Sequence, residues 1–434
     1  MDFVQITGGR KLQGKVSIQG SKNATLPMIA AALLHRGVSV LKGCPKLADV
    51  YYMEEILRAL GAQTWWEGEN LYLDCSYADK TEIPEELSKK MRSSIILMGA
   101  ILARNKKVTV GYPGGCVIGA RPIDLHLQVL RGFGVEIMET SSLLVGKCDK
   151  MRGSEIVFEK KSVGATEQGI LAAVLAEGKT VLRNCSLEPE ILHLCHFLET
   201  MGAEISGAGS ACICITGKEE LRGGEMKVPP DRIVAGTYFC AAAITRGRIE
   251  MEHVPLEEMG AFLEVYRKIG GQYQGKSGKL VADGSRVQYP AEFQTDTYPG
   301  FPTDLQSPMT AVLATIPGES HVKETIFEDR YKAVTQLRRM GAHIEIEGAY
   351  ARIYGGRPLK GSELYAQELR GGAALVLAGL AAEGVTTLWG YHYIQRGYAC
   401  MIEELRALGG LVTRNTGIKI YENIQLSQTD SGKY

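Results

Sequence analysis

Apolar and polar positions along the chain repeat in blocks of roughly 70 residues. Each block contains an Ala/Leu-rich segment that predicts a helix, then a turn residue, then an alternating segment that predicts a strand, as in AAVLAEGKTVL. Glycine and asparagine accept the left-handed conformation that ends many helices. We therefore expect the turns at Gly37, Asn105, Gly178, Gly247, Gly318 and Gly384.

A second phrase runs in step with the first. LRALGA returns as LRGFGV, LETMGA, YRKIGG, LRRMGA and LRALGG, and each copy is followed by two short strand patterns such as AHIEIEG and YARIYG. Each unit thus predicts a helix, a strand, a helix ending at a glycine, and two strands. Six units in 434 residues divide into two domains of three. The glycines that end the second helices are Gly61, Gly134, Gly202, Gly270, Gly341 and Gly409.

The residues before the first unit, ITGGRKLQGKVSIQG, are patterned as strands with no helix of their own. We expect them to complete the last unit and so to close the second domain on itself. Units of this length carry enough secondary structure to pack around a shared core, which favours a closed α/β fold over an open array.

Composition excludes several classes of function. Hydrophobic residues make up 45% and charged residues 23% of the chain, and Lys+Arg equals Asp+Glu at 49 each, so neither nucleic acid nor a membrane surface is an expected partner. No uninterrupted apolar run approaches the roughly 20 residues of a membrane span, and the N-terminus lacks a signal-peptide core, so we expect a cytoplasmic protein.

The cysteines and histidines do not predict a metal site. The ten cysteines form no CxxC pair, and Cys212-Ile-Cys214 alternates like one face of a strand. His193-Leu-Cys-His196 lies in a helix-patterned segment, and the sequence offers no second cluster of ligands. We expect buried thiols and no metal.

Charged residues gather where helices begin. Lys22 and Asn23 stand before the helix ATLPMIAAALL, with Pro27 in its expected first turn, and Arg121 stands before a helix expected to begin at Pro122. Free N–H groups and the positive end of a helix dipole favour an anion there. The same position before or at a helix start is held by Asp304, Arg330, Arg370 and Arg396.

Taken singly, each of these charged side chains fits an ordinary solvated surface residue. Their shared place in the repeat favours a site, because equivalent helices of a closed repeat fold point alike and their N-termini converge. Two such ends facing each other predict an anion-binding cleft. Cys116 lies among glycines close to Arg121, which fits either a buried thiol or a reactive thiol in a flexible loop.

An ordered set of motifs resembles the UDP-N-acetylglucosamine enolpyruvyl transferase family. The motifs are GGCVIGARPIDLH, SVGATE, EPEI, PPDRI, FPTDLQ, ETIFEDR and IQRGY, and the likeness ends only at the polar tail after about Asn423. The resemblance implies a two-domain inside-out α/β barrel of the EPSP synthase type. Residues 22–229 would form one domain, residues 1–21 and 230–423 the other, and residues 424–434 a polar tail.

The resemblance also implies a reaction, the first committed step of peptidoglycan precursor synthesis in cell-wall biogenesis. The enolpyruvyl group of phosphoenolpyruvate passes to the 3′-hydroxyl of UDP-N-acetylglucosamine, and phosphate is released. These two molecules would be the partners of a monomer that needs no cofactor. Cys116 would also be alkylated by the epoxide phosphonate fosfomycin.

The roles of single residues follow from the resemblance as well. Cys116, with Lys22 as its rival, would be the general acid, and Asp304 would act as base or position the sugar. Lys22, Arg121 and the catalytic Arg396 would take the phosphate, and Arg330 and Arg370 the carboxylate. The remaining substrate-binding candidates are Asn23, Arg92, Pro122, Ile123, Asp124, Leu125, Ser162, Val163, Gly164, Ile326 and Glu368.

Three departures from the family pattern leave alternatives open. Glu368 and Gln395 stand where the family usually has aspartate, and Val234-Ala235 replaces a more polar pair. A carboxylate moved by about 1 Å near the chemistry can cost on the order of 10²-fold in rate. The alternatives are a diverged paralogue with another nucleotide-sugar acceptor and an inactive UDP-sugar-binding regulatory protein. Shikimate-3-phosphate enolpyruvyl transferases share the fold and donor but lack the GGC loop.

Overall fold

The computed structural model describes residues 2–115, 118–119 and 122–415. Six similar units follow one another, as the repeating pattern predicts. The first unit consists of α1 (Lys22–Ala32), β3 (Val38–Lys42), α2 (Ala48–Leu60), β4 (Gln63–Glu67) and β5 (Asn70–Asp74). The glycine after each second helix is left-handed, with φ between 83° and 107°. Side chains rarely adopt that conformation, which explains why glycine returns at this place.

Two of the expected helix-ending turns are wrong by one residue. Lys106 (φ 63°) and Arg246 (φ 53°) are left-handed, whereas Asn105 still belongs to its helix and Gly247 does not have a positive φ. Gly247 is needed for a close approach instead, because a Cβ there would lie 2.3 Å from the carbonyl oxygen of Leu12.

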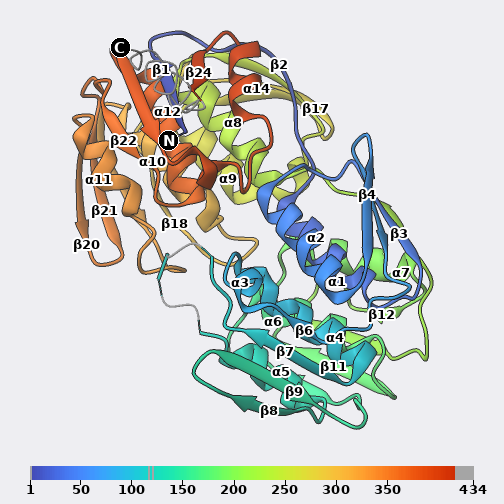
Figure 1. The fold of residues 1–434 in the computed structure, drawn as a ribbon. Coiled ribbons are helices and arrows are strands. Elements are labelled where there is room, and N and C mark those ends of the chain that lie inside the picture. Colours follow the sequence, from blue (N-terminus) through green and yellow to red (C-terminus); the bar gives the residue numbers. More distant parts are fainter. Residues whose placement is uncertain (1, 116–117, 120–121, 416–434) are drawn as a thin grey trace, which may run out of the picture.

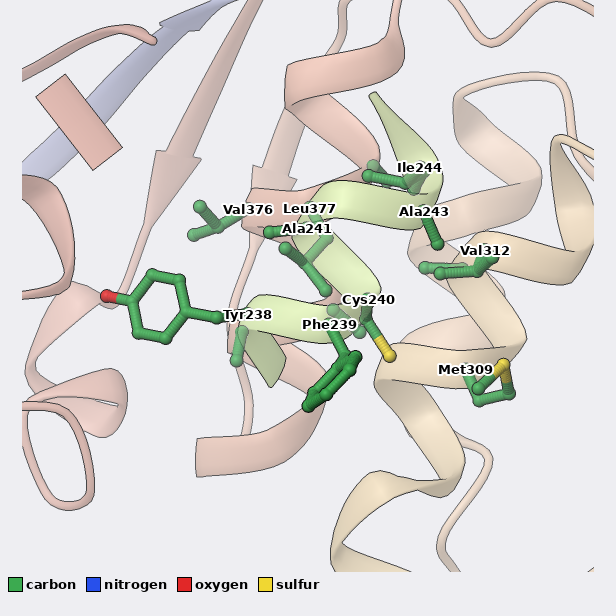
Figure 2. Close-up of a cluster of buried hydrophobic side chains, with 14 of the residues drawn as sticks. Tyr238, Phe239, Cys240, Ala241, Ala243, Ile244, Met309, Val312, Val376 and Leu377 are labelled. Carbon is green, nitrogen blue, oxygen red and sulfur yellow. The ribbon is translucent and has the colours of Figure 1, made fainter. Parts of the chain in front are cut away.

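The first helix of each unit lies inside its domain. All 13 residues of α8 are buried, and α8 packs against α10 and α12 through apolar side chains on all sides, as Figure 2 shows for Phe239, Cys240 and Val312. Helices that are apolar all round belong in a core. These central helices are α1, α4 (Leu97–Asn105), α6 (Val163–Ala173), α8 (Arg232–Ile244), α10 (Gln306–Ala314) and α12 (Leu369–Ala381).

The second helix of most units is amphipathic. In α11 the residues Ala333, Val334 and Leu337 are buried, while charged residues cover the opposite face. The second helices are α2, α5 (Asp124–Gly132), α7 (Pro189–Thr200), α9 (Gly260–Lys268), α11 (Lys332–Arg339) and α14 (Met401–Ala407). Short helical segments are α3 (Glu85–Ser88), η1 (Arg92–Ile96), η2 (Leu256–Glu258), η3 (Thr303–Leu305) and α13 (Tyr391–Ile394).

Three four-stranded sheets surround each trio of central helices. In every sheet an edge strand runs parallel to the strand after the central helix, and antiparallel partners follow. Apart from β2 (Gln13–Ser17), which lies in the N-terminal segment patterned as strands, the sequence patterns did not predict these edge strands. In the first domain the remaining strands are β6 (Glu82–Ile83), β7 (Lys107–Gly111), β8 (Glu136–Glu139), β9 (Leu143–Lys147), β10 (Glu155–Val157), β11 (Lys179–Arg183), β12 (Glu204–Ser206), β13 (Cys212–Thr216) and β14 (Glu225–Lys227).

The N-terminal residues complete the second domain. β1 (Phe3–Thr7) lies between β23 (Val385–Trp389) and β24 (Leu411–Asn415), so the prediction that the N-terminal residues complete the last unit is confirmed for this strand, whereas the strand after it joins another unit. β2 (Gln13–Ser17) is the edge strand of the fourth unit. The other strands of this domain are β15 (Arg248–Glu252), β16 (Gln272–Lys276), β17 (Lys279–Asp283), β18 (Glu292–Gln294), β19 (Gly318–Lys323), β20 (His343–Glu347), β21 (Tyr350–Gly355) and β22 (Glu363–Tyr365).

The structure has two separate apolar cores. One collects buried residues between Ala24 and Val228, and the other joins residues 4–18 to residues 233–412. The two places where the chain passes between the cores lie side by side, at the bridge between Gly20 and Pro230. Figure 1 shows the resulting domains, with the blue N-terminal strands among the orange and red elements. No helix in the described ranges has the length and apolar character of a membrane span.

Candidate active site

A cleft of about 620 Å³ lies between the two domains. Its walls are the N-terminal ends of the central helices and the loops that precede them, so the predicted convergence of helix starts is found. Of the described candidates only Ile123 does not line it. The predicted residues that do are Lys22, Asn23, Arg92, Pro122, Asp124, Leu125, Ser162, Val163, Gly164, Asp304, Ile326, Arg330, Glu368, Arg370 and Arg396.

Two predicted residues, Cys116 and Arg121, lie outside the described residues. The expected start of the following helix at Pro122 is wrong, because α5 begins at Asp124 and Ile123 is its N-cap. The carbonyl oxygen of Pro122 accepts a hydrogen bond from Arg92 at 2.8 Å. This segment is therefore held by the cleft wall before the helix begins.

Helix α1 begins earlier than the pattern predicts. Lys22 is its first residue, because the Ser21 side chain caps the helix by accepting from the backbone N–H of Ala24 at 3.3 Å. Pro27 consequently lies in the second turn and not in the first. The error leaves the argument for an anion intact, since Lys22 and Asn23 still occupy the positive end of the helix.

Asp304 joins two arginines of the second domain. Its Oδ1 lies 2.6 Å from Nη2 of Arg330, and its Oδ2 lies 2.8 Å from Nη2 of Arg370. Both arginines are only 2% exposed. Arg330 is also fixed by a 3.2 Å hydrogen bond from Nε to the carbonyl oxygen of Thr303. The backbone turn η3 and the start of α12 thus set the geometry of three charges.

The electrostatics of this group keep all three side chains charged. Burial works to raise the pKa of Asp304, but the positive charges of Arg370, Arg330 and Lys22 outweigh it and hold that pKa well below its usual range. Burial lowers the pKa of Arg370, and Asp304 more than offsets this and raises it. Nε and Nη1 of Arg370 are buried and make no hydrogen bond to the described residues, so they remain as donors for an anion.

Glu368 is the N-cap of α12. Its carboxylate accepts hydrogen bonds from the backbone N–H groups of Arg370, at 2.7 Å, and of Gly371. Oε2 also lies 3.8 Å from Nη1 of Arg330. Glu368 has one methylene more than aspartate, and its side chain folds back onto the start of its own helix to accommodate it. Glu368 thus caps the helix as an aspartate commonly does.

The other departures from the family pattern, Val234-Ala235 and Gln395, also fit their surroundings in the structure. Val234 and Ala235 are fully buried within α8, where apolar side chains suit the core. The side chain of Gln395 accepts a hydrogen bond from Nη2 of Arg414 at 3.2 Å.

A second carboxylate, Asp49, was not predicted. It lies in the first turn of α2 and is 3% exposed. Its oxygens lie 2.7 and 3.3 Å from Arg396 and 3.6 Å from Nζ of Lys22. A signal for it existed: Asp49, Asp124 and Glu190 are the first-turn acids of the second helices in the first three units, and all three line the cleft.

One wall of the first domain is tightly packed. Ser162 caps α6 by accepting from a backbone N–H of the first turn at 3.3 Å. Gly164 is needed next to it, because a Cβ there would lie 3.0 Å from the His126 ring. The backbone at the start of α6 is consequently open to the cleft.

A buried acidic group in the same domain also lines the cleft and was also not predicted. Glu190 pairs with Arg232 at 3.2 and 3.3 Å, across the two domains, and Glu188 accepts from the backbone N–H of Tyr298 at 3.3 Å. Burial, Glu190 and Glu188 raise the pKa of Glu167 well above its usual range. The motifs EPEI and PPDRI contain three of these residues, but nothing in their spacing shows that they meet.

No group of three or more His, Cys, Asp and Glu side chains suited to a metal ion occurs in the described part of the chain. His193, half of the HLCH motif, has its Nε2 3.1 Å from Glu258 of the other domain. The motif therefore contributes to the contact between the domains.

Comparison with known proteins assigns the family. Residues 6–405 match the model of the EPSP synthase (3-phosphoshikimate 1-carboxyvinyltransferase) family. UDP-N-acetylglucosamine 1-carboxyvinyltransferase 2 of Caldanaerobacter subterraneus subsp. tengcongensis is 44% identical over 95% of this chain and 100% of its own length. The chain belongs to the EPSP synthase family and, within it, to the UDP-N-acetylglucosamine 1-carboxyvinyltransferases.

Another member of this family and two solved structures extend the comparison. The UDP-N-acetylglucosamine 1-carboxyvinyltransferase of Deinococcus radiodurans is 41% identical over 94% of this chain and 96% of its own. The enolpyruvyl transferase NikO from Streptomyces tendae has the same fold, with a TM-score of 0.87 at 24% identity over 95% of this chain and 99% of NikO. EPSP synthase from Acinetobacter baumannii has a TM-score of 0.74 at 18% identity, and the comparison covers 96% of this chain and 100% of that one.

Proposed function

We propose that the protein transfers the enolpyruvyl group of phosphoenolpyruvate to the 3′-hydroxyl of UDP-N-acetylglucosamine and releases phosphate. In a bacterial cell this is the first committed step of peptidoglycan precursor synthesis. One observation carries the proposal: Lys22, Arg330, Arg370 and Arg396 meet in a single interdomain cleft. Membership of the family supports the choice of acceptor.

The four cations suit the two anionic groups of the donor. Arg330 and Arg370 are fixed side by side in the second domain, and a planar guanidinium binds a carboxylate bidentately. The buried Nε and Nη1 donors of Arg370 support its assignment to the carboxylate. Lys22, at the start of α1, and Arg396 share one neighbour in Asp49 and are assigned, with Arg121, to the phosphate.

The reaction is an addition followed by an elimination. The sugar hydroxyl gives its proton to a base as its oxygen bonds to C2 of phosphoenolpyruvate, and a general acid gives a proton to C3, which forms a tetrahedral intermediate. C2 then loses phosphate and C3 loses a proton, which restores the double bond. We assign Cys116 or Lys22 as the acid, and the enclosing walls of the cleft exclude water from the intermediate.

The surroundings of Asp304 favour a positioning role. A carboxylate whose pKa is held well below its usual range is a weak base. Two charge-assisted contacts to Arg330 and Arg370 fix its orientation, so it can hold the attacking hydroxyl in line. We therefore place Asp304 at the 3′-hydroxyl as an acceptor that orients it.

The assignment of Cys116 has its own test. Fosfomycin should alkylate this thiol, and mass spectrometry of the digested protein should locate the added mass on the peptide that contains Cys116. A Cys116→Asp variant should acquire no adduct and resist inhibition. An adduct on Cys400, which is exposed, with none on Cys116 would contradict a reactive thiol in the loop.

The organisation of the chain belongs to the same proposal. We assign residues 22–229 to the first domain, residues 1–21 and 230–423 to the second, and residues 424–434 to a polar tail outside the described residues. The two separate cores support this division. A monomer in the cytoplasm, where both substrates are made, is the expected form.

The direct test is phosphate release from phosphoenolpyruvate by the purified protein. Release should require UDP-N-acetylglucosamine and should not occur with shikimate 3-phosphate or without an acceptor. Release with a different nucleotide sugar alone would favour the diverged paralogue. Binding of UDP-N-acetylglucosamine without phosphate release in the presence of any acceptor would favour the inactive regulatory protein.

A further inference from the structure

Three polar side chains of the first domain meet at the cleft without a complete set of partners. Glu167 lies in α6, Ser186 lies in the segment that leads to α7, and Glu188 is the N-cap of α7. The backbone N–H of Ser186 donates to the hydroxyl of Thr166 at 3.2 Å, which ties this segment to α6 beside Glu167. Glu167, Ser186 and Glu188 all line the interdomain cleft.

Two of these side chains have buried polar atoms that are not engaged. Ser186 is only 1% exposed, and neither its hydroxyl nor Oε2 of Glu188 has a hydrogen-bond partner among the described residues. Oε1 of Glu188 accepts from the backbone N–H of Tyr298 at 3.3 Å, so only one of its two oxygens is used. Unpaired buried polar groups are unfavourable, which indicates that this part of the cleft is built to pair with a ligand.

The charges of this region select what it can bind. Glu190 is neutralised by Arg232, with contacts at 3.2 and 3.3 Å. Burial and the charges of Glu190 and Glu188 raise the pKa of Glu167 well above its usual range, and no hydrogen bond opposes this. Glu167 therefore keeps its proton, and the Glu188 carboxylate leaves one negative charge. Such a surface repels phosphate and carboxylate, whereas a hydroxyl or an amide can accept from Glu167 and donate to Glu188.

The place of Glu167 along α6 relates this region to a nucleotide sugar. Val163 is the first residue of α6, and Glu167, four residues later, lies on the same face about 6 Å further along the helix axis. The start of α6 is open to the cleft and favours a phosphate group. An uncharged group about one helical turn away from the diphosphate belongs to the sugar.

We propose that Glu167, Ser186 and Glu188 form a subsite for an uncharged hydrogen-bonding group of the acceptor sugar, either the acetamido group or a hydroxyl other than the reacting one. Glu167 donates a hydrogen bond to this group, Glu188 accepts one from it, and the Ser186 hydroxyl does either. The subsite favours an acceptor that carries no negative charge at this place. The inference rests on the proposed function, because it takes UDP-N-acetylglucosamine as the acceptor.

The experiment measures the dissociation constant of UDP-N-acetylglucosamine for the full chain by isothermal titration calorimetry. Glu167→Gln retains a neutral donor and should bind within about threefold of the wild type. Glu167→Leu and Ser186→Ala each remove a hydrogen bond and should weaken binding about five- to tenfold. All three variants should bind UDP, which lacks the sugar, as the wild type does.

The matched control is Glu54→Gln, which changes another fully buried glutamate of the first domain. Glu54 does not line the cleft, and its carboxylate accepts hydrogen bonds from Arg58, Thr64 and Trp66. The variant should lose stability and still bind UDP-N-acetylglucosamine within about twofold of the wild type. A loss of affinity as large as that of Glu167→Leu would mean that any defect in this domain weakens binding, which contradicts the proposal.

Three further results would overturn the proposal. They are unchanged affinity in Glu167→Leu, an equal loss in Glu167→Gln, which would show that a charge is required, and an equal loss for UDP. UDP-glucose has a hydroxyl in place of the acetamido group: an effect of Glu167→Leu that persists with it assigns the subsite to a hydroxyl, and one that disappears assigns it to the acetamido group. Binding needs no turnover, so a wild type that binds UDP-N-acetylglucosamine and releases no phosphate would contradict the proposed function alone.

Discussion

The two carboxylates of the cleft differ in where their cations come from. Asp304 receives Arg330 and Arg370 from its own domain, so the three charges form a preset group that the fold of one domain holds. Asp49 receives Lys22 from its own domain and Arg396 from the other, so its group exists only when the domains are together. The same chemistry therefore occurs in two arrangements: one group is preorganised within one domain, and the other joins the two domains.

The largest expected effect is at Asp304. Asp304→Asn leaves two nearly buried arginines with one charge fewer between them, which should lower kcat/KM by at least about 10²-fold and destabilise the protein by about 3 kcal/mol. It should leave the radius of gyration unchanged, because both arginines that contact Asp304 belong to its own domain. Kinetics, thermal unfolding and small-angle X-ray scattering on the same samples measure kcat/KM, stability and the radius of gyration.

The control for Asp304 is Asp283→Asn, which changes the same residue type on strand β17, away from the residues that line the cleft. It should retain kcat/KM within about twofold. The comparison between the two carboxylates would fail if Asp304→Asn increased the radius of gyration.

A buried carboxylate that pairs with no cation among the described residues sharpens the comparison. Burial raises the pKa of Glu404 from 4.5 to about 7, although the hydroxyl of Tyr238 donates a hydrogen bond to it. A raised pKa in the fold means that stability is fully present below the unfolded pKa and is lost as pH rises through about 7. Glu404→Gln, neutral at every pH, should therefore stabilise the protein by about 2 kcal/mol at pH 8.

The gain from Glu404→Gln should shrink as the pH is lowered from 7 and vanish near pH 4.5, measured by urea unfolding at each pH. The control Glu199→Gln changes an exposed carboxylate and should have the same small effect at both pH values. A gain independent of pH would mean that packing, and not the absence of a cation, determines the effect.

The smallest effect is expected at Glu368. Glu368→Gln weakens the cap of α12 and removes the charge near Arg330, which should cost about 1 kcal/mol in thermal unfolding. Glu368→Asp restores the residue usual in the family and keeps the cap, so its stability and kcat/KM should stay within about 0.5 kcal/mol and threefold of the wild type. A large loss in Glu368→Asp would show that the longer side chain is required by this chain's own packing.

Much of this organisation was predictable from local patterns. The glycine after each second helix needs a left-handed backbone, so its return at Gly61 or Gly409 marks the units directly. Lys22 and Arg370 were likewise predictable as candidates for an anion site, because they stand at helix starts, where the dipole and the free N–H groups favour an anion. Equivalent positions in a closed repeat then converge in one cleft.

What was not predictable depends on contacts between distant parts of the chain. Apart from β2, the parallel edge strands have only two or three residues, too few to show an alternating pattern, and β14 for example is defined by its pairing with β3. Asp49 is an ordinary first-turn acid until the other domain brings Arg396 to it. Helix boundaries shifted where a cap decided them, as Ser21 did for α1. Each of these features is fixed by tertiary packing, which a single sequence does not display.

The most direct test of the proposed function is the identity of the product. The purified protein would be incubated with phosphoenolpyruvate and UDP-N-acetylglucosamine, and the nucleotide sugar recovered for mass spectrometry and proton NMR. We predict a nucleotide sugar heavier by one carboxyvinyl group, with vinyl protons and an ether link at the 3′-oxygen. Recovery of unchanged UDP-N-acetylglucosamine from an active, folded preparation, or attachment at another oxygen, would contradict the proposed reaction.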